Sequence, residues 1–165
     1  MGDIGLTARQ ALAELRRLLG ALRAAGDDAP ALAPQPGVDD LDSLVDAVRR
    51  AGLDVDVGVE GQPRPLPAGV GLSAYPIVQE ALTNVLRHAH ARRACVTLRY
   101  DDDQLVVCVA DDGSAGSGPS PGADGHRHGL IGMRERVALF GGELAAGART
   151  GGGFRVEARL PIPGP

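Results

Sequence analysis

The sequence predicts an α/β sandwich of two layers, in which a mixed and largely antiparallel sheet carries helices on one face. Three segments place apolar residues three and four positions apart, as amphipathic helices do. Other short segments are rich in valine or alternate apolar with polar residues, as strands do, and two of them flank an acidic turn typical of a hairpin. The helical segments lie at 39–51, 75–89 and 129–140, and the strand-like segments at 55–59, 95–100, 105–110, from 144, and 154–160.

Ahead of this domain, residues 7–24 form a leucine- and alanine-rich stripe that predicts an N-terminal helix. The stripe suits either a helix packed on its own domain or the end of a longer dimerisation helix. An alanine-, glycine- and proline-rich run follows, and its prolines forbid a continuous helix. We therefore divide the chain into an N-terminal segment at 1–25, a linker at 26–38 and a main domain at 39–163.

The first helix of the main domain carries acidic residues in its first turn and arginines in its last, which favours the helix dipole, and Gly52 ends it. With two Phe, two Tyr and no Trp in the whole chain, the core must be aliphatic. From this helix we expect the core to receive Leu41, Leu44, Val45 and Val48.

The helix over 75–89 begins after a predicted N-cap at Ser73 and carries Pro76 in its first turn. Its polar residues Glu80, Asn84 and His88 follow one another at i, i+4 and i+8 and form a column opposite the apolar face. Such a column is either a solvated helix face or a chemical site. In the second case, the carboxylate polarises a water or hydroxyl and the amide oxygen binds a hard cation such as Mg²⁺.

Two glycine-containing segments lie further along the chain. Asp111, Asp112 and Gly113 end a predicted strand, which suits either a plain turn or a carboxylate that accepts a hydrogen bond from an adenine amine. A glycine-led helix start at Gly129 and Gly132 is either punctuation or a phosphate site made of free helix amides. Residues 114–128 between them have no regular pattern, and we expect a long mobile loop that acts as a lid.

Composition excludes several mechanisms. The chain has no lysine, so a Walker A loop, the lysine of eukaryotic protein kinases and Schiff-base chemistry are all excluded. A net charge of −4 without a basic stripe argues against direct nucleic-acid binding. We expect Cys95 and Cys108, which sit in apolar strand-like runs, to be buried and reduced. No apolar run approaches the roughly 20 residues of a membrane span, so we expect a cytoplasmic location.

The strings YPIVQEALTNVLRHA, VADDG, GLIGMRERV and GGGFRVEARLP resemble the N box, the two glycine boxes and the closing strand of the Bergerat-fold ATP-binding domain of the GHKL superfamily. The likeness is strongest to the catalytic domain of bacterial sensor histidine kinases whose response regulators end in a helix-turn-helix. It covers about residues 39–163. Residues 1–25 then look like the end of the dimerisation and phosphoacceptor helix.

The resemblance implies a binding site for ATP and Mg²⁺. Asn84 would ligate the Mg²⁺, Glu80 would orient or deprotonate the attacking group or serve as a second metal ligand, and Asp111 would hold the adenine amine while Gly113 leaves room for the ring. The further ATP contacts that it implies are Arg87 and His88 beyond Asn84, Gly129, Leu130 and Gly132 in the second glycine box, and either Arg134 or Arg136 on the phosphates.

Some positions depart from the family pattern. Ala115 replaces the usual second glycine of the first box, with Gly116 one place late, and Arg127 stands where the second box often has glycine. The threonine that many relatives carry in the closing box is replaced around Phe154. The first histidine is His88, so the family's phosphoacceptor histidine is absent from this chain. We therefore expect it to bind ATP but not to autophosphorylate alone.

The predicted function is transfer of the γ-phosphoryl of ATP to a histidine on a separate dimerisation domain, and from there to a response regulator with helix-turn-helix output. The resemblance implies a homodimer for the full-length protein, and membrane attachment only through a region absent from this chain. Two alternatives are an anti-sigma-factor-type serine kinase and a non-catalytic nucleotide-binding module.

Overall fold

The computed structural model describes residues 35–113 and 123–162, without the side chains of 123–127. The predicted N-terminal helix, most of the linker and residues 114–122 of the predicted lid lie outside the described part. The helices are the 3₁₀ helix η1 (Val38–Asp40), α2 (Leu41–Arg50), α3 (Ala68–Asn84), the π-helix η2 (Val85–Ala89) and α4 (Ala123–Ala138). The strands are β1 (Asp54–Gly61), β2 (Arg93–Tyr100), β3 (Gln104–Asp111), β4 (Glu143–Ala148) and β5 (Phe154–Pro161).

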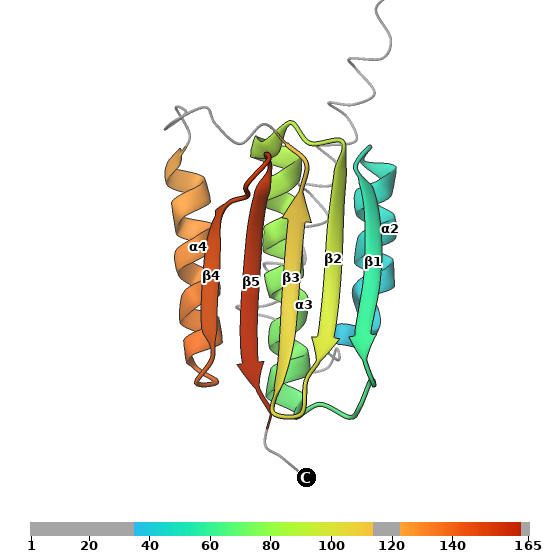
Figure 1. Cartoon of the computed structure of the whole chain (residues 1–165), viewed down its shortest axis with the longest axis vertical. Coiled ribbons are helices and arrows are strands. Elements are labelled where there is room, and N and C mark those ends of the chain that lie inside the picture. The colour runs from blue at the N-terminus through green and yellow to red at the C-terminus, as the bar shows by residue number, and fades with distance from the viewer. Residues whose placement is uncertain (1–34, 114–122, 163–165) are drawn as a thin grey trace, which may run out of the picture.

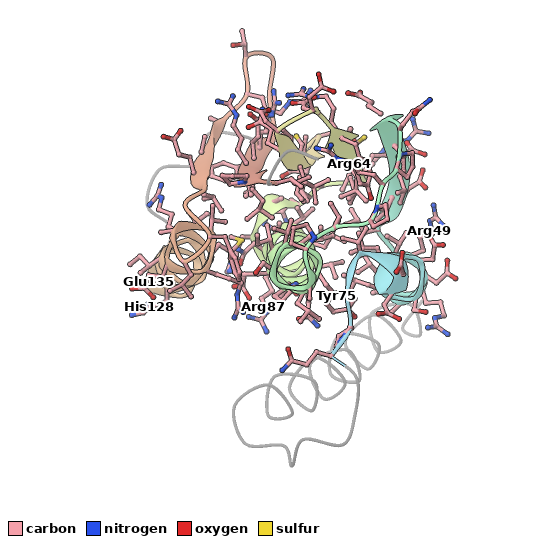
Figure 2. All side chains as sticks on the ribbon, turned by 90° about the horizontal axis from the view of Figure 1, so that it is seen from below. Arg49, Arg64, Tyr75, Arg87, His128 and Glu135 are labelled. Atoms are coloured by element: carbon pink, nitrogen blue, oxygen red, sulfur yellow. The ribbon has the colours of Figure 1, made fainter. Side chains whose placement is uncertain are left out.

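The five strands form one sheet in the order β1-β2-β3-β5-β4. β1 pairs parallel with β2, and the other neighbours are antiparallel, including the predicted β2–β3 hairpin. The helices α2, α3 and α4 all lie on one face of this sheet (Figures 1 and 2). This arrangement confirms the predicted two-layer α/β sandwich with a mixed, largely antiparallel sheet. Among the described helices, none is long and apolar enough to cross a membrane.

The core lies between the two layers and is aliphatic, as the composition required. α2 contributes the four predicted residues, all of which are buried. α3 lies across the middle of the sheet and contributes the largest set, including Ile77 and Leu82, which are fully buried. From the sheet, alternate residues of β2, β3 and β5 point inward, because successive side chains of a strand face opposite sides.

Two helix starts were predicted wrongly. α3 begins at Ala68, so Ser73 is a buried interior residue rather than the N-cap, and Pro76 lies inside the helix. Val70 and Ala74 carry the buried face back towards this earlier start. Gly69 permits it, because a Cβ there would overlap the ring of Phe140.

α4 begins at Ala123 rather than at Gly129, so residues 123–128 are helical although we expected them in the loop. No proline occurs between 123 and 138, and a helix already formed by the apolar residues further on can extend back at one hydrogen bond per residue. The amides of Gly129 and Gly132 therefore lie inside a helix and not at its free N-terminus.

The prediction for the two cysteines was also wrong in part. Both are free, but Cys95 is exposed and Cys108 is half-buried. The inward positions of β2 are taken by Ala94, Val96 and Leu98, so Cys95 falls on the open face of the sheet. Cys108 pairs with Thr97 on the same face. Burial raises the pKa of the Cys108 thiol above its ordinary value, and the neighbouring Arg155 guanidinium offsets only part of this rise.

Candidate functional site

Three segments that are distant in sequence meet at one end of the domain. The C-terminal end of α3, the C-terminal end of β3 and the N-terminal half of α4 all lie at the upper end of the sheet in Figure 1. α3 is the central helix of its layer and packs against both β3 and α4. The polar residues that the sequence singled out on α3 and at the end of β3 are therefore at the same end of the molecule.

The predicted column on α3 is partly buried rather than a solvated helix face. Asn84 is only 7% exposed, and its Nδ2 has no hydrogen-bond partner in the part of the chain that the structure describes. Glu80, one turn earlier, is half-buried. Gly129 of α4 lies against both, because a Cβ there would overlap the Glu80 carboxylate and lie 3.4 Å from Asn84 Nδ2. The structure thus brings Glu80, Asn84 and Gly129 into one cluster.

Beyond Asn84 the helix changes to a π-helix, a form that is rare and often found at functional sites. It ends at His90, whose φ of 48° is left-handed. Arg87 and His88 belong to this segment and are both exposed. Figure 2 places Arg87 on the outer surface of the helix layer, beside α3 on the side towards α4.

The end of β3 holds the second candidate group. Asp111 is 4% exposed, and its Oδ1 accepts a hydrogen bond of 2.8 Å from the Gly113 amide. Gly113 has no room for a side chain, because a Cβ there would overlap the carbonyl oxygen of Ala89 at the end of the π-helix. We predicted that Gly113 leaves room for a base, whereas the space beside it is filled by the chain itself. The contact instead packs the end of β3 against the end of η2.

The neighbouring Asp112 is exposed and holds the start of β2. Its Oδ1 accepts hydrogen bonds from the amides of Arg92 and Arg93, both at 2.9 Å. The hydrogen bond from the Arg93 amide is the main reason why the pKa of this carboxyl lies below its ordinary value of 3.8. Asp112 therefore links the end of β3 to the start of β2.

This shift predicts a pH dependence of stability. A lowered pKa in the folded state means that the unfolded chain binds the proton more readily, so the stabilisation is present above pH 3.8 and is lost as the pH falls through the folded-state pKa. We expect Asp112→Asn, which keeps the acceptor oxygen but not the charge, to lose less stability than the wild type between pH 4 and pH 2. Urea unfolding at several pH values measures this, and equal losses in both proteins would contradict it.

The structure places the residues of the second glycine box in different environments. Leu130 is half-buried against the core, whereas Gly132 is exposed and has open space around it. Arg134 and Arg136 are also exposed. Arg136 lies in the last turn of α4, roughly 10 Å along the helix from Gly129. Of the residues predicted on this helix, the structure brings Gly129 to the cluster on α3.

One group of residues at this end was missed by the sequence analysis. Arg149, in the turn between β4 and β5, donates from Nη1 to the carbonyl oxygen of Asp111 at 3.1 Å. Gly153 of the same turn packs on that carbonyl oxygen so closely that a Cβ would overlap it. The run of three glycines at 151–153 was a signal for a tight turn, but nothing in the sequence indicated which strand the turn would contact.

The arrangement offers one half-buried acid, one buried amide with an unpaired polar atom, and one buried acid at a strand end. Among the described residues, no group of three or more His, Cys, Asp and Glu side chains could hold a metal ion.

The sequence of this chain is similar to those of known proteins. Residues 69–164 match the family described as histidine kinase-, DNA gyrase B-, and HSP90-like ATPase. Sensor histidine kinase YxjM of Bacillus subtilis is 35% identical over 76% of this chain and 30% of its own length. Signal transduction histidine-protein kinase/phosphatase UhpB of Salmonella typhimurium is 31% identical over 89% of this chain and 28% of its own length. The chain thus spans less than a third of these two relatives.

The fold is also similar to that of a solved histidine kinase structure. The histidine kinase domain from the Erythrobacter litoralis EL346 blue-light activated histidine kinase superposes with a TM-score of 0.56 at 25% identity, covering 93% of this chain and 80% of that one. These comparisons confirm the fold and the family predicted from the sequence. Because the family model spans more than half of the sequence, the chain belongs to the family of histidine kinase-, DNA gyrase B- and HSP90-like ATPases.

Proposed function

We propose that this chain is the ATP-binding catalytic domain of a two-component sensor histidine kinase. The observation that carries the proposal is that one end of the domain holds both a buried amide at Asn84, whose Nδ2 has no partner among the described residues, and a buried carboxylate at Asp111. Buried polar groups normally have hydrogen-bond partners, and an orphaned one is costly unless a ligand completes it. The relatives named as sensor histidine kinases support the same assignment.

The residues fit Mg-ATP. The amide oxygen of Asn84 is a hard donor of the kind that Mg²⁺ prefers, and Glu80 on the same face of α3 supplies a carboxylate beside it. Asp111 uses Oδ1 for the Gly113 amide, which leaves Oδ2 to accept a hydrogen bond from the adenine amine. When bound, Mg²⁺ would neutralise charge on the phosphate chain.

Glu80 is the residue we assign to the attacking group. In the proposed reaction the imidazole of an acceptor histidine attacks the γ-phosphorus, the bond to the bridging oxygen breaks, and ADP leaves. Glu80 would accept a hydrogen bond from the imidazole N–H and hold the other nitrogen towards the phosphorus. Positioning and charge neutralisation account for most of the rate enhancement in such phosphoryl transfers.

The acceptor histidine would come from a dimerisation domain of the same kinase. From there the phosphoryl group would pass to a response regulator with helix-turn-helix output.

We place this activity in the cytoplasm, where ATP is available. The full-length protein would form a homodimer through its dimerisation helices, and a membrane anchor, where one exists, would belong to a region outside this domain. Arg87 and His88, which are exposed on η2, are proposed to contact the phosphate chain.

The test is a phosphotransfer assay. The chain is mixed with a separately prepared dimerisation domain that carries the acceptor histidine, and γ-labelled ATP is added. We expect label on the dimerisation domain that is lost in acid, as phosphohistidine is, and that disappears when the acceptor histidine is replaced. Acid-stable label would indicate a serine kinase instead, and ATP binding without any transfer would indicate a nucleotide-binding module without catalysis.

A further inference from the structure

The turn between β4 and β5 is a rigid unit that contacts the end of β3. The Arg149 amide donates to the Gly153 carbonyl at 3.0 Å, and the Gly152 amide donates to the Arg149 carbonyl at 3.1 Å. Gly151, Gly152 and Gly153 all have positive φ, between 84° and 108°, which other residues rarely adopt. The backbone that carries Arg149 is therefore fixed by its own hydrogen bonds.

From this turn, two contacts hold the backbone of Asp111. The Arg149 guanidinium donates to the Asp111 carbonyl oxygen at 3.1 Å, and Gly153 lies directly against the same oxygen. On the opposite side, Asp112 bonds to the start of β2 through both its side chain and its amide. The end of β3 is thus held from the β5 side by the turn and from the β2 side by Asp112.

These contacts determine where the Asp111 carboxylate lies. Its side chain has only two torsions, and its Oδ1 is bound to the Gly113 amide two residues on. A movement of the 111–113 backbone therefore moves the carboxylate with it. A hydrogen bond to a ligand amine weakens steeply when its distance or angle departs from the optimum.

We propose that Arg149 is a positioning residue for nucleotide recognition, and that by holding the Asp111 carbonyl it sets the preference of the site for adenine. The inference rests on the proposed function, because it takes the Asp111 carboxylate to be the acceptor for the adenine amine. Arg149 itself does not touch the base. Its contribution is confined to the base-recognising carboxylate, so the phosphate and metal contacts are independent of it.

A second arginine nearby provides a matched control. Arg149 and Arg155 both line a shallow groove beside β4 and β5. Arg155 pairs with Ala110 across the sheet and forms an ion pair with Glu157. Replacing either arginine with alanine removes the same charge from the same groove, but only Arg149 donates to the Asp111 carbonyl among the described contacts.

The experiment measures affinities for two nucleotides by calorimetry in the presence of Mg²⁺. ATP carries the amine that Asp111 would accept from, whereas inosine triphosphate carries an oxygen at that position. We expect the wild type to prefer ATP. Arg149→Ala should bind ATP about tenfold more weakly, as expected when the hydrogen bond from the adenine amine to the charged Asp111 carboxylate is lost, and inosine triphosphate with unchanged affinity. Arg155→Ala should behave as the wild type.

The outcomes separate this inference from the proposed function. If the wild type binds neither nucleotide, the proposed function fails and the inference with it. If the wild type prefers ATP, and Arg149→Ala keeps that preference or loses affinity for both nucleotides equally, the positioning role is wrong and the proposed function stands. Arg149→Lys retains a donor, so its preference should lie between those of wild type and alanine. A lysine variant with less preference than alanine would also overturn the inference.

Discussion

Replacing Asn84 with alanine should weaken Mg-ATP binding by about a hundredfold and abolish phosphoryl transfer, without loss of stability. The affinity falls because the proposed Mg²⁺ ligand is removed, and replacing even a residue that only supports a metal ligand typically costs about 10- to 100-fold in metal affinity. Calorimetry with Mg-ATP and the phosphotransfer assay measure the two effects.

The stability half of this prediction depends on the unpaired amide. Asn84 is almost fully buried and its Nδ2 has no partner among residues 35–113 and 123–162, which costs the folded domain about 1–3 kcal/mol. Alanine removes that penalty, but it also leaves a small cavity that destabilises the folded state. The two effects oppose each other, so the free energy of unfolding should stay within about 1 kcal/mol of the wild type. A residue retained for folding alone would behave differently, because its loss would destabilise the domain.

The neighbouring Thr83 is the control. It is 8% exposed, and its Oγ1 donates to the Gln79 carbonyl at 2.7 Å, so its polar group is paired within the helix. We expect Thr83→Val to bind Mg-ATP as the wild type does. If Asn84→Ala binds Mg-ATP normally, or unfolds more easily by several kcal/mol, then Asn84 serves the fold and the proposed metal role is wrong.

Much of the fold could be predicted because its local patterns agree with its packing. The four core residues of α2 and the alternation along β5 depend only on periods of 3.6 and 2, which the sequence displays directly. The errors lie at positions where the start of a helix or the exposure of a side chain depends on a segment that is distant in sequence. Gly69 lies ahead of the helix start predicted from the sequence, but it lets α3 begin early against Phe140, which is distant in sequence. Cys95 lies in an apolar run, and its exposure depends on register and not on composition.

The candidate site shows the same division. Glu80 and Asn84 are one helical turn apart, so their proximity could be predicted from spacing. The approach of Gly129 to both, and of Gly113 to Ala89, depends on how α4 and β3 pack against α3. Arg149 had no signal at all, because an arginine in a glycine-rich turn is ordinary unless the acceptor is known. Family resemblance suggests which residues would contact ATP, but not which residues would hold them in place.

Gly153→Ala should be the most destabilising substitution of a single small residue at this end of the domain. The φ of Gly153 is 84°, and forcing alanine into the left-handed region costs about 1–2 kcal/mol. Its Cβ would also overlap the Asp111 carbonyl oxygen and lie 2.8 Å from the carbonyl carbon. Both of these atoms belong to the backbone of β3 and cannot rotate aside. We expect a total loss of about 3 kcal/mol or more in the free energy of unfolding.

Gly147→Ala supplies the comparison, because it adds the same methyl group to β4 of the same hairpin. Gly147 has no atom within 4 Å of its would-be Cβ and no positive φ, so alanine there should change stability by no more than about 0.5 kcal/mol. Urea unfolding of the two variants measures the difference. Equal stabilities would mean that Gly153 is not tightly packed against the Asp111 carbonyl. Of the two contacts by which the turn is inferred to hold that carbonyl, only the hydrogen bond from Arg149 would then remain.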